Sequence, residues 1–570
     1  MIMSAKQLHR FTLIFFIAAL ITPALCTAQS PETEQLLRQQ ERERELRQQN
    51  EIQKSSHLPT PKLEAFLLPT EETPCQVIQT LILQGDASEY FQWALAAADR
   101  NNDPARGRCL GPLGIDVVIQ RIQQAILDRG YVTTRVLAEK QDLRNGALTL
   151  TLLPGRIRHI RFEDGTPSRA TLWNAMPAKP GDILNVRELE QGLDNFKRLP
   201  SADANLRINS VQDADAVRSE SDVIIEWKQA LPFRLNLSLD DAGSKYTGKH
   251  QAALTLAYDH WWTLNDLFYV SVNQAVGGGL PGDRGSQAQT IHYSVPWKEW
   301  LMSATATRFE YYQMMPGLNQ NYNYHGNGNN HELAVTRLLS RNSISKTSAS
   351  LRWWSRESRN FIDDAEVRPQ RRDTGGWELG LNHRLQIGTA SIDANLAARR
   401  GTGAFGSRTA PEEAFDEGTS RMQILRADAT LSVPFRLASQ RLRYGAGWRA
   451  QWNGTPLTPQ DRFAIGSRYT VRGFDGESFL SGDSGWFLRQ ELGLSLTPIA
   501  SELYAGVDTG KVGGRSTTTL LGNRLTGAVI GLRGNAARVS WDLFLARPLD
   551  KPEGFRTSST TAGFFLGLNF

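Results

Sequence analysis

The strongest constraint in this 570-residue chain is an alternation of apolar and polar residues that recurs in segments throughout its last 340 residues. In one such segment Trp377, Leu379 and Leu381 share one face, whereas Glu378 and Asn382 share the other. A period of two residues is that of a β-strand. Nearly every segment carries bulky apolar residues on one face, which a soluble β-sandwich, the alternative fold, does not require. The pattern predicts a mainly β fold with strands that face lipid.

The number and spacing of these segments predict an outer-membrane barrel. Residues 231–570 contain 16 segments, which start near 231, 249, 264, 287, 301, 330, 344, 375, 389, 421, 440, 484, 502, 525, 537 and 560. Short connections are expected at 261–263, 298–300, 342–343, 388, 435–439 and 497–501. Long connections are expected at 276–286, 313–329, 357–374, 401–420, 454–483 and 510–524. Short periplasmic turns that alternate with longer outside loops are typical of such barrels.

Aromatic residues gather near the expected strand ends, which favours membrane-interface girdles over scattered positions. These residues are Trp261, Trp262, Trp297, Trp300, Trp353 and Trp354. The mean hydropathy of −0.39 resembles that of a soluble protein, because strands of a barrel dilute their apolar residues with polar ones.

The one long apolar stretch, residues 11–25, is shorter than the roughly 20 residues that a membrane helix needs. An α-helical membrane protein is therefore excluded. The stretch follows a weakly basic segment and precedes small residues, so residues 1–28 are predicted to be a cleaved signal peptide. A buried N-terminal helix is the alternative.

Residues 29–52 predict a helix, because they are rich in helix formers and contain no Gly. Its leucines form no continuous stripe, so the helix is solvated or lies in a polar cavity. A disordered charged leader is the alternative. Residues 53–74 contain four prolines and predict an extended linker.

Residues 75–154 and 155–230 each predict a small α+β unit with the order β-α-α-β-β. The first unit has strands at 77–83, 132–138 and 147–153 and helices at 88–99 and 115–129. The second has strands at 157–162, 205–211 and 222–227 and helices at 169–176 and 186–199. Two copies of one order support each other.

Two cysteines, Cys75 and Cys109, remain after cleavage of the signal peptide. An even pair in an exported protein favours a disulfide. It would close a loop of 34 residues, which stabilises a fold by roughly 3–4 kcal/mol in the chain-entropy model. Two free thiols are the alternative, and no metal site can be built from the pair.

Two motifs lie in the predicted barrel. They are Val471, Arg472, Gly473 and Phe474 in the long connection 454–483, and Gly506, Asp508 and Gly510 near the end of the thirteenth strand. Alternation turns Asp508 into the lumen, together with Arg489 and Glu491 on the preceding strand. An enclosed carboxylate needs a cationic partner. A connection folded back into the barrel could bring Arg472, whose guanidinium binds a carboxylate at two points.

With both motifs, the paired units, the helix and the linker in this order, the chain resembles the two-partner secretion transporters (TpsB). These are the hemolysin secretion/activation proteins of Gram-negative bacteria, of the ShlB, FhaC and HecB type, and the resemblance extends to CdiB-like members. It implies a 16-stranded outer-membrane β-barrel, two periplasmic α+β POTRA domains and an N-terminal plug helix. It also implies that loop 454–483 folds into the pore and that Arg472 pairs with Asp508. The cysteine pair resembles a disulfide in the first POTRA of some members.

The resemblance implies export without chemistry. The POTRA domains would capture an unfolded exoprotein by strand addition, and the lumen would pass it outward after the plug leaves. The exoprotein is a hemolysin, an adhesin or a contact-dependent toxin. A net charge of +5 without a basic block gives nucleic-acid binding little support. No cofactor or metal is expected, the chain is expected to be monomeric, and its other contact is outer-membrane lipid.

The first alternative is a barrel-assembly factor of the same superfamily, which two POTRA-like units and a preceding helix disfavour. A passive porin would not need the periplasmic region. An enzyme is not expected. Residues 506–511 superficially resemble a phosphate loop, but their spacing is one residue short and Val512 occupies the Ser/Thr position.

Overall fold

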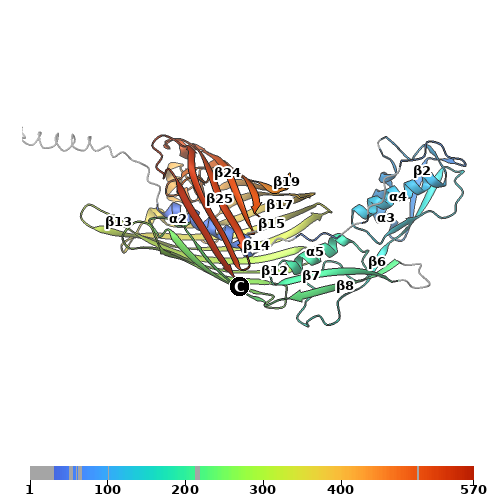
Figure 1. Cartoon of the computed structure of the whole chain (residues 1–570), viewed down its shortest axis with the longest axis horizontal. Helices are drawn as coiled ribbons and strands as arrows, with labels where there is room; N and C mark the ends of the chain where they lie inside the picture. Colours follow the sequence, from blue (N-terminus) through green and yellow to red (C-terminus); the bar gives the residue numbers. More distant parts are fainter. Residues whose placement is uncertain are drawn as a thin grey trace, which may run out of the picture.

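A computed structural model of the chain describes residues 31–50, 55–58, 61, 67–100, 102–211, 219–496 and 500–570. The molecule is elongated, with a β-barrel that encloses one helix and two small α+β units that extend from one end of the barrel (Figure 1). The expected signal peptide, residues 1–28, lies outside the described residues. Within the described ranges no helix is both long and apolar enough to cross a bilayer.

The first unit places a three-stranded sheet against its helices. Its elements are β1 (Gln76–Ile78), β2 (Thr80–Gly85), α3 (Ser88–Phe91), the 3-10 helix η1 (Gln92–Ala98), β3 (Arg108–Leu110), α4 (Pro112–Asp128), β4 (Arg135–Leu137) and β5 (Ala147–Leu153). Strand β5 lies in the centre, parallel to β2 and antiparallel to β4. Leu148, Leu150 and Leu152 of β5 are fully buried in one apolar core with Val118 and Ile122 of α4.

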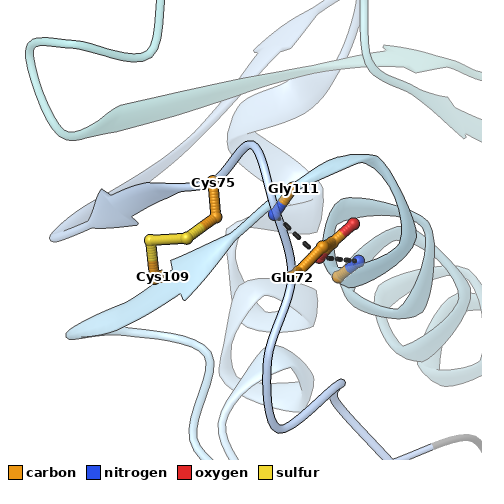
Figure 2. Close-up of a disulfide and its surroundings, with 5 residues drawn as sticks. Glu72, Cys75, Cys109 and Gly111 are labelled. Atoms are coloured by element: carbon orange, nitrogen blue, oxygen red, sulfur yellow. Dashed lines mark hydrogen bonds between the residues drawn. A yellow bond between two sulfur atoms is a disulfide. The ribbon is translucent and has the colours of Figure 1, made fainter.

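A disulfide joins Cys75 to Cys109 and ties β1 to β3 (Figure 2). These strands form a two-stranded sheet, and such a sheet is marginal without further support. Beside it, the Glu72 carboxylate accepts backbone N–H groups of Gly111, Leu113 and Gly114 at the start of α4, at 2.6–3.0 Å. Burial raises the pKa of Glu72, but these three N–H groups hold it below its usual value.

The second unit repeats the arrangement with β6 (Gly155–Phe162), α5 (Val186–Lys197), β7 (Ala202–Val211) and β8 (Ser219–Gln229). Strand β8 lies between β6 and β7. The helix expected at 169–176 is wrong, because these residues form turns. Pro167 and Pro177 bound the segment, and the residue before a proline disfavours helix. Asn174 instead donates to the Leu264 carbonyl of the barrel at 2.5 Å.

Sixteen spanning strands in the described ranges close the barrel, as expected from the alternation. They are β9 (Phe233–Asp240), β10 (His250–Asp259), β11 (Leu267–Gly277), β12 (Arg284–Trp297), β13 (Trp300–Pro316), β14 (Asn321–Arg341), β15 (Ser345–Ile362), β17 (Arg372–Ile387), β18 (Ala390–Thr402), β19 (Gln423–Leu437), β20 (Gln440–Asn453), β23 (Ser484–Leu496), β24 (Ser501–Gly513), β25 (Arg524–Ala536), β26 (Val539–Asp550) and β27 (Thr561–Asn569). Strand β27 pairs antiparallel with β9 and closes the ring. The two-residue β16 (Ala365–Glu366) only extends the edge of β15.

The long connection expected at 313–329 is wrong. Strand β13 continues to Pro316 and β14 begins at Asn321, so the two strands form a long hairpin. The Gly and Asn residues of this stretch suggested a loop. In the structure two of the glycines make room for aromatic rings, since an added Cβ would lie 2.7 Å from the Tyr311 ring at Gly326 and 2.4 Å from the Phe309 ring at Gly328.

The side chains of Trp297, Trp300 and Trp353 on the barrel strands are exposed, as are those of Trp261 and Trp262 in the turn between β10 and β11. The girdle position expected for Trp354 is wrong, because its side chain is buried, and the Arg399 guanidinium lies 3.8 Å from the centre of its ring. Neighbouring residues of a strand point to opposite faces, so Trp353 and Trp354 cannot both face lipid.

Candidate functional site: the filled barrel lumen

Loop 454–483 folds back against the inner wall of the barrel. Its short strands β21 (Phe463–Ile465) and β22 (Leu480–Gly482) pair as a hairpin. Val471 and Phe474 are buried in one apolar cluster with residues of the same loop, of three barrel strands and of the last outer connection, namely Phe463, Ile465, Leu480, Phe487, Val512, Leu525 and Phe555. The rings of Phe474 and Phe555 meet edge to face at 5.8 Å. The loop is therefore anchored by a small core of its own.

Glycines in the loop and in the barrel strands allow the two backbones to approach each other closely. Gly473 has φ +111°, and an added Cβ there would lie 2.6 Å from the Arg547 carbonyl oxygen. An added Cβ at Gly527 of β25 would lie 1.9 Å from the Arg472 carbonyl oxygen. At Gly510 an added Cβ would lie 3.0 Å from a methyl of Val471. The glycines of the two motifs thus share one physical reason, the close approach of loop and strand.

Arg472 and Asp508 form a two-point ion pair at this contact. The Arg472 Nε lies 2.7 Å from Asp508 Oδ2 and its Nη2 lies 2.8 Å from Oδ1. The Arg472 backbone N–H donates to the same Oδ2 at 3.0 Å. Asp508 is fully buried and Arg472 is 6% exposed. In a buried pair of this kind, removal of one partner leaves an uncompensated charge.

Glu491 extends this pair into a network. It accepts Arg472 Nη1 at 3.0 Å, and its other oxygen accepts Arg443 at 2.9 Å and Arg533 at 2.6 Å. Both of these arginines also donate to Glu502. Arg443, Arg533 and Glu502 were not predicted as site residues, although the same alternation that turned Glu491 inward also turns them inward.

Arg489 lies farther from the pair than its inward position suggests. Its Nε is 3.9 Å from Asp508 Oδ2. Its Nη1 donates to the Tyr469 carbonyl at 3.3 Å. Arg489 therefore contacts the pore loop directly through the Tyr469 carbonyl. It supports the loop only weakly through Asp508, the ion-pair partner of Arg472. Of the wall motif, Gly506 allows the pair to form, since an added Cβ there would lie 3.1 Å from Arg472 Nη2.

Helix α2 (Pro31–Asn50) lies inside the barrel (Figure 1, dark blue). Polar contacts tie it to the wall on several sides, with Arg44 at 2.7 Å from Asp428, Arg47 at 2.5 Å from Glu332 and Glu41 at 2.5 Å from Arg449. Arg38 donates to the Ala242 carbonyl, just beyond the end of wall strand β9, at 2.8 Å and to the Gly476 carbonyl of the pore loop at 2.6 Å. Helix, loop and wall therefore meet at one side chain.

A cavity of about 1710 Å³ remains beside the helix. Among the charged barrel residues that line it, thirteen are Lys or Arg and seven are Asp or Glu. The lumen is thus polar and carries an excess of positive charge. Within the described ranges, no group of three or more His, Cys, Asp or Glu side chains is placed to hold a metal ion.

The second unit docks on the end of the barrel that carries the short turns. Besides Asn174, the Asn195 side chain donates to the Lys298 carbonyl at 2.7 Å, and Arg198 donates to the Asn265 carbonyl at 2.8 Å. The pore loop comes from the opposite end. The lumen therefore lies between a docking unit at one end and an inward loop from the other.

Comparisons with known proteins agree with this arrangement. Residues 219–534 match the family model of the haemolysin secretion/activation protein ShlB/FhaC/HecB. Residues 88–155 match the ShlB-type POTRA domain, and residues 156–209 match another POTRA model.

Relatives and solved structures extend the likeness to nearly the whole chain. The outer membrane transporter CdiB-2 of Burkholderia pseudomallei is 36% identical over 90% of this chain and 89% of its own. The outer membrane transporter CdiB of Escherichia coli is 25% identical over 94% and 88%. The structure of CdiB from Acinetobacter baumannii superposes with a TM-score of 0.83 at 29% identity, over 94% of this chain and 98% of that one. The chain therefore belongs to the haemolysin secretion/activation protein family and is an outer-membrane transporter with periplasmic POTRA domains.

Proposed function

We propose that helix α2 and loop 454–483 close the export path together and that the exported protein displaces them. The observation that carries the proposal is the double contact of Arg38, which joins the helix to the wall and to the loop tip at Gly476. Most of the bonds that hold the helix are ion pairs and hydrogen bonds. Water or a passing polypeptide can replace such bonds, so the helix can leave a wet lumen at little cost.

The POTRA units would capture the exported protein in the periplasm while it is unfolded. Strands β2 and β4 form the edges of the first sheet, and β6 and β7 form those of the second. Ile82 and Leu137 on the first pair of edges are exposed apolar side chains. An extended peptide can add to such an edge by main-chain hydrogen bonds while its side chains cover the apolar residues.

We assign the exported partner to the contact-dependent toxins, since the relatives named above are CdiB transporters. A hemolysin is the second candidate, because the matching family model carries that description. We further propose that the transporter acts as a monomer in direct contact with lipid. One chain closes its own barrel through β27 and β9, and outward residues such as Leu379 and Leu381 are exposed.

The gating role is tested by Arg472→Ala in cells that also express the exported partner from the neighbouring gene. We expect reduced secretion with normal barrel assembly, which heat-modifiable migration in gels reports. Arg515→Ala is the matched control, because its side chain pairs with Asp416 and both are 75% exposed. Normal secretion by Arg472→Ala would contradict the gating role.

The plug role has a separate test in planar bilayers. Removal of residues 31–50 leaves the barrel strands intact and opens the lumen, so we expect a large rise in conductance. Unchanged conductance would show that the loop alone closes the path. An assembly factor, the alternative function, predicts instead that loss of this protein lowers the amounts of other outer-membrane barrels, and we expect those amounts to stay constant.

A further inference from the structure

Two buried carboxylates on α5 lie at the junction between the second POTRA unit and the barrel. Glu190 is fully buried and Asp194 is 6% exposed. Arg341 at the end of β14 joins them, with Nε 2.9 Å from Glu190 and Nη1 2.6 Å from Asp194. Lys346 of β15 lies 3.0 Å from Asp194. Burial raises the pKa of Asp194, but the Lys346 and Arg341 charges hold it below its usual value, so the group stays ionised.

Each carboxylate also accepts a backbone N–H from the linker that follows the plug. The Ser56 N–H donates to Asp194 Oδ1 at 2.7 Å, and the Leu58 N–H donates to Glu190 Oε1 at 2.8 Å. The Arg341 guanidinium also donates a hydrogen bond to the Ser56 carbonyl. His57 lies between these residues and is exposed. The site therefore holds two linker residues, Ser56 and Leu58, that are separated by one exposed residue.

The spacing explains why an extended backbone fits. Residues four apart on a helix are separated by about 6 Å along the axis. Residues two apart in an extended chain are separated by about 6.6 Å. In both bonds the donor is a main-chain N–H, a group that every residue except proline possesses. Besides these bonds, Leu58 packs against the apolar core of the second unit. The site is thus suited to bind the main chain of an extended segment that carries one apolar side chain. Its contacts set no requirement for the other side chains.

We propose that the Glu190–Asp194 pair is a binding site for an extended segment of the exported polypeptide, and that residues 55–58 of the linker occupy it before export. This inference rests on the proposed export function. The site lies where the second POTRA unit meets the barrel, on the route of an unfolded chain toward the lumen. Ser56 follows the end of α2 by six residues, so an incoming segment that replaces the linker also loosens the tether of the plug.

The test uses the full-length protein in detergent and a fluorescent peptide of residues 53–61. Ser56→Pro removes the N–H that Asp194 accepts and leaves both POTRA units and the barrel unchanged. We expect the peptide to bind this variant at least about tenfold more tightly than it binds wild type, because the linker no longer competes well for the carboxylate. His57→Pro is the matched control, since the two N–H groups that α5 accepts belong to Ser56 and Leu58, and it should behave as wild type.

Peptides methylated at one backbone nitrogen test which N–H group the site binds, without a further change in the protein. A peptide methylated at the amide nitrogen that corresponds to Ser56 should bind the Ser56→Pro variant at least about tenfold more weakly. Methylation at the His57 nitrogen should have little effect. A peptide of unrelated sequence with Leu at the same place should bind within about threefold. Equal binding of the two methylated peptides would overturn the inference, even if an Asp194→Asn variant failed to fold.

Competition identifies the natural occupant. The exported partner, unfolded in urea and diluted, should displace the peptide from the Ser56→Pro variant, and the folded partner should not. If neither displaces it, the site is only an anchor for the linker and the inference fails. Peptide binding is measured without export, so a protein that binds peptides as described but secretes nothing would instead contradict the proposed function.

Discussion

The same alternation has opposite consequences in the first POTRA unit and in the barrel. In β5, every second residue is a leucine that is fully buried, as at Leu148 and Leu150. In β17, the leucines at alternate positions are exposed instead, at 53% for Leu379 and 44% for Leu381. The barrel keeps its charges inside and turns its apolar residues toward lipid. A period of two therefore reveals a strand, while the neighbouring segments and the solvent decide which face is buried.

The two regions also differ in whether the edge strands of their sheets are paired. The barrel closes on itself through β27 and β9, whereas the first POTRA unit has open sheets and a disulfide beside its smallest one. The barrel should depend on its buried charges, and the POTRA unit on apolar burial and its covalent link. Four predictions test this contrast.

The largest effect is expected for Asp508→Ala, which leaves Arg472 buried with Glu491 as its remaining acidic partner. Loss of one member of a buried pair costs about 3–5 kcal/mol. We expect loop 454–483 to become sensitive to protease and the channel to open more often in planar bilayers. Asp416→Ala, at a 75% exposed pair, should change neither. A fully protected loop in Asp508→Ala would contradict a dependence of the barrel interior on this pair.

Replacement of Cys75 and Cys109 by Ser should destabilise the first POTRA unit by roughly 3–4 kcal/mol. Hydrogen exchange of the β5 peptide in the full-length protein measures this loss, and exchange in the barrel strands should stay unchanged. If the barrel strands lost protection equally, the two regions would not be independent in stability.

Leu150→Ala and Leu381→Ala compare the two kinds of leucine directly. The first removes buried core atoms and leaves a cavity, at a cost of about 2–5 kcal/mol. The second loses only the transfer of about three carbons, roughly 2 kcal/mol, because lipid fills the space. Urea unfolding, followed by hydrogen exchange in each region, should rank Leu150→Ala as the more damaging change. The reverse order would mean that Leu381 packs against protein.

The smallest effect is a pH dependence that belongs to the POTRA unit alone. The pKa of Glu72 is lower in the folded chain than in the unfolded chain, so its carboxylate stabilises the fold above the ordinary value of about 4.3. This stabilisation is lost as the pH falls through the lowered folded-state pKa. Protection of β5 should therefore differ between wild type and Glu72→Gln near neutral pH and converge in acid. A constant difference at every pH would contradict this role of Glu72.

The alternation was sufficient to predict the barrel and its strand number, because each strand reports its own two faces. It could not place the 313–329 segment, where glycines near Tyr311 and Phe309 serve packing between strands rather than a turn. The helix expected at 169–176 failed for a related reason. Its local preference was overridden by contacts such as that of Asn174 with the barrel, which lie far away in sequence.

The site shows the same limit. Charge and direction made Arg472 one possible partner for Asp508, since one lies in a long loop and the other faces the lumen, and the resemblance to the family implied the pair. Alternation turns Arg443 and Arg533 inward as well, but the register that sets them beside Glu491 across β20, β23 and β25 could not be read from the sequence. The linker bonds of Ser56 and Leu58 involve main-chain atoms, which leave no mark in a sequence.

The even polarity of helix α2 has one further consequence. In the described part of the helix, Leu36 is the main apolar residue that is buried against the wall. The helix would therefore expose no continuous apolar face to water on leaving the lumen. An isolated helix of this length is marginal in water, and its backbone then regains conformational freedom. If the helix leaves the lumen as proposed, it would stay soluble and lose its helical order, and it would fold again only on return to the barrel, which would make its removal reversible.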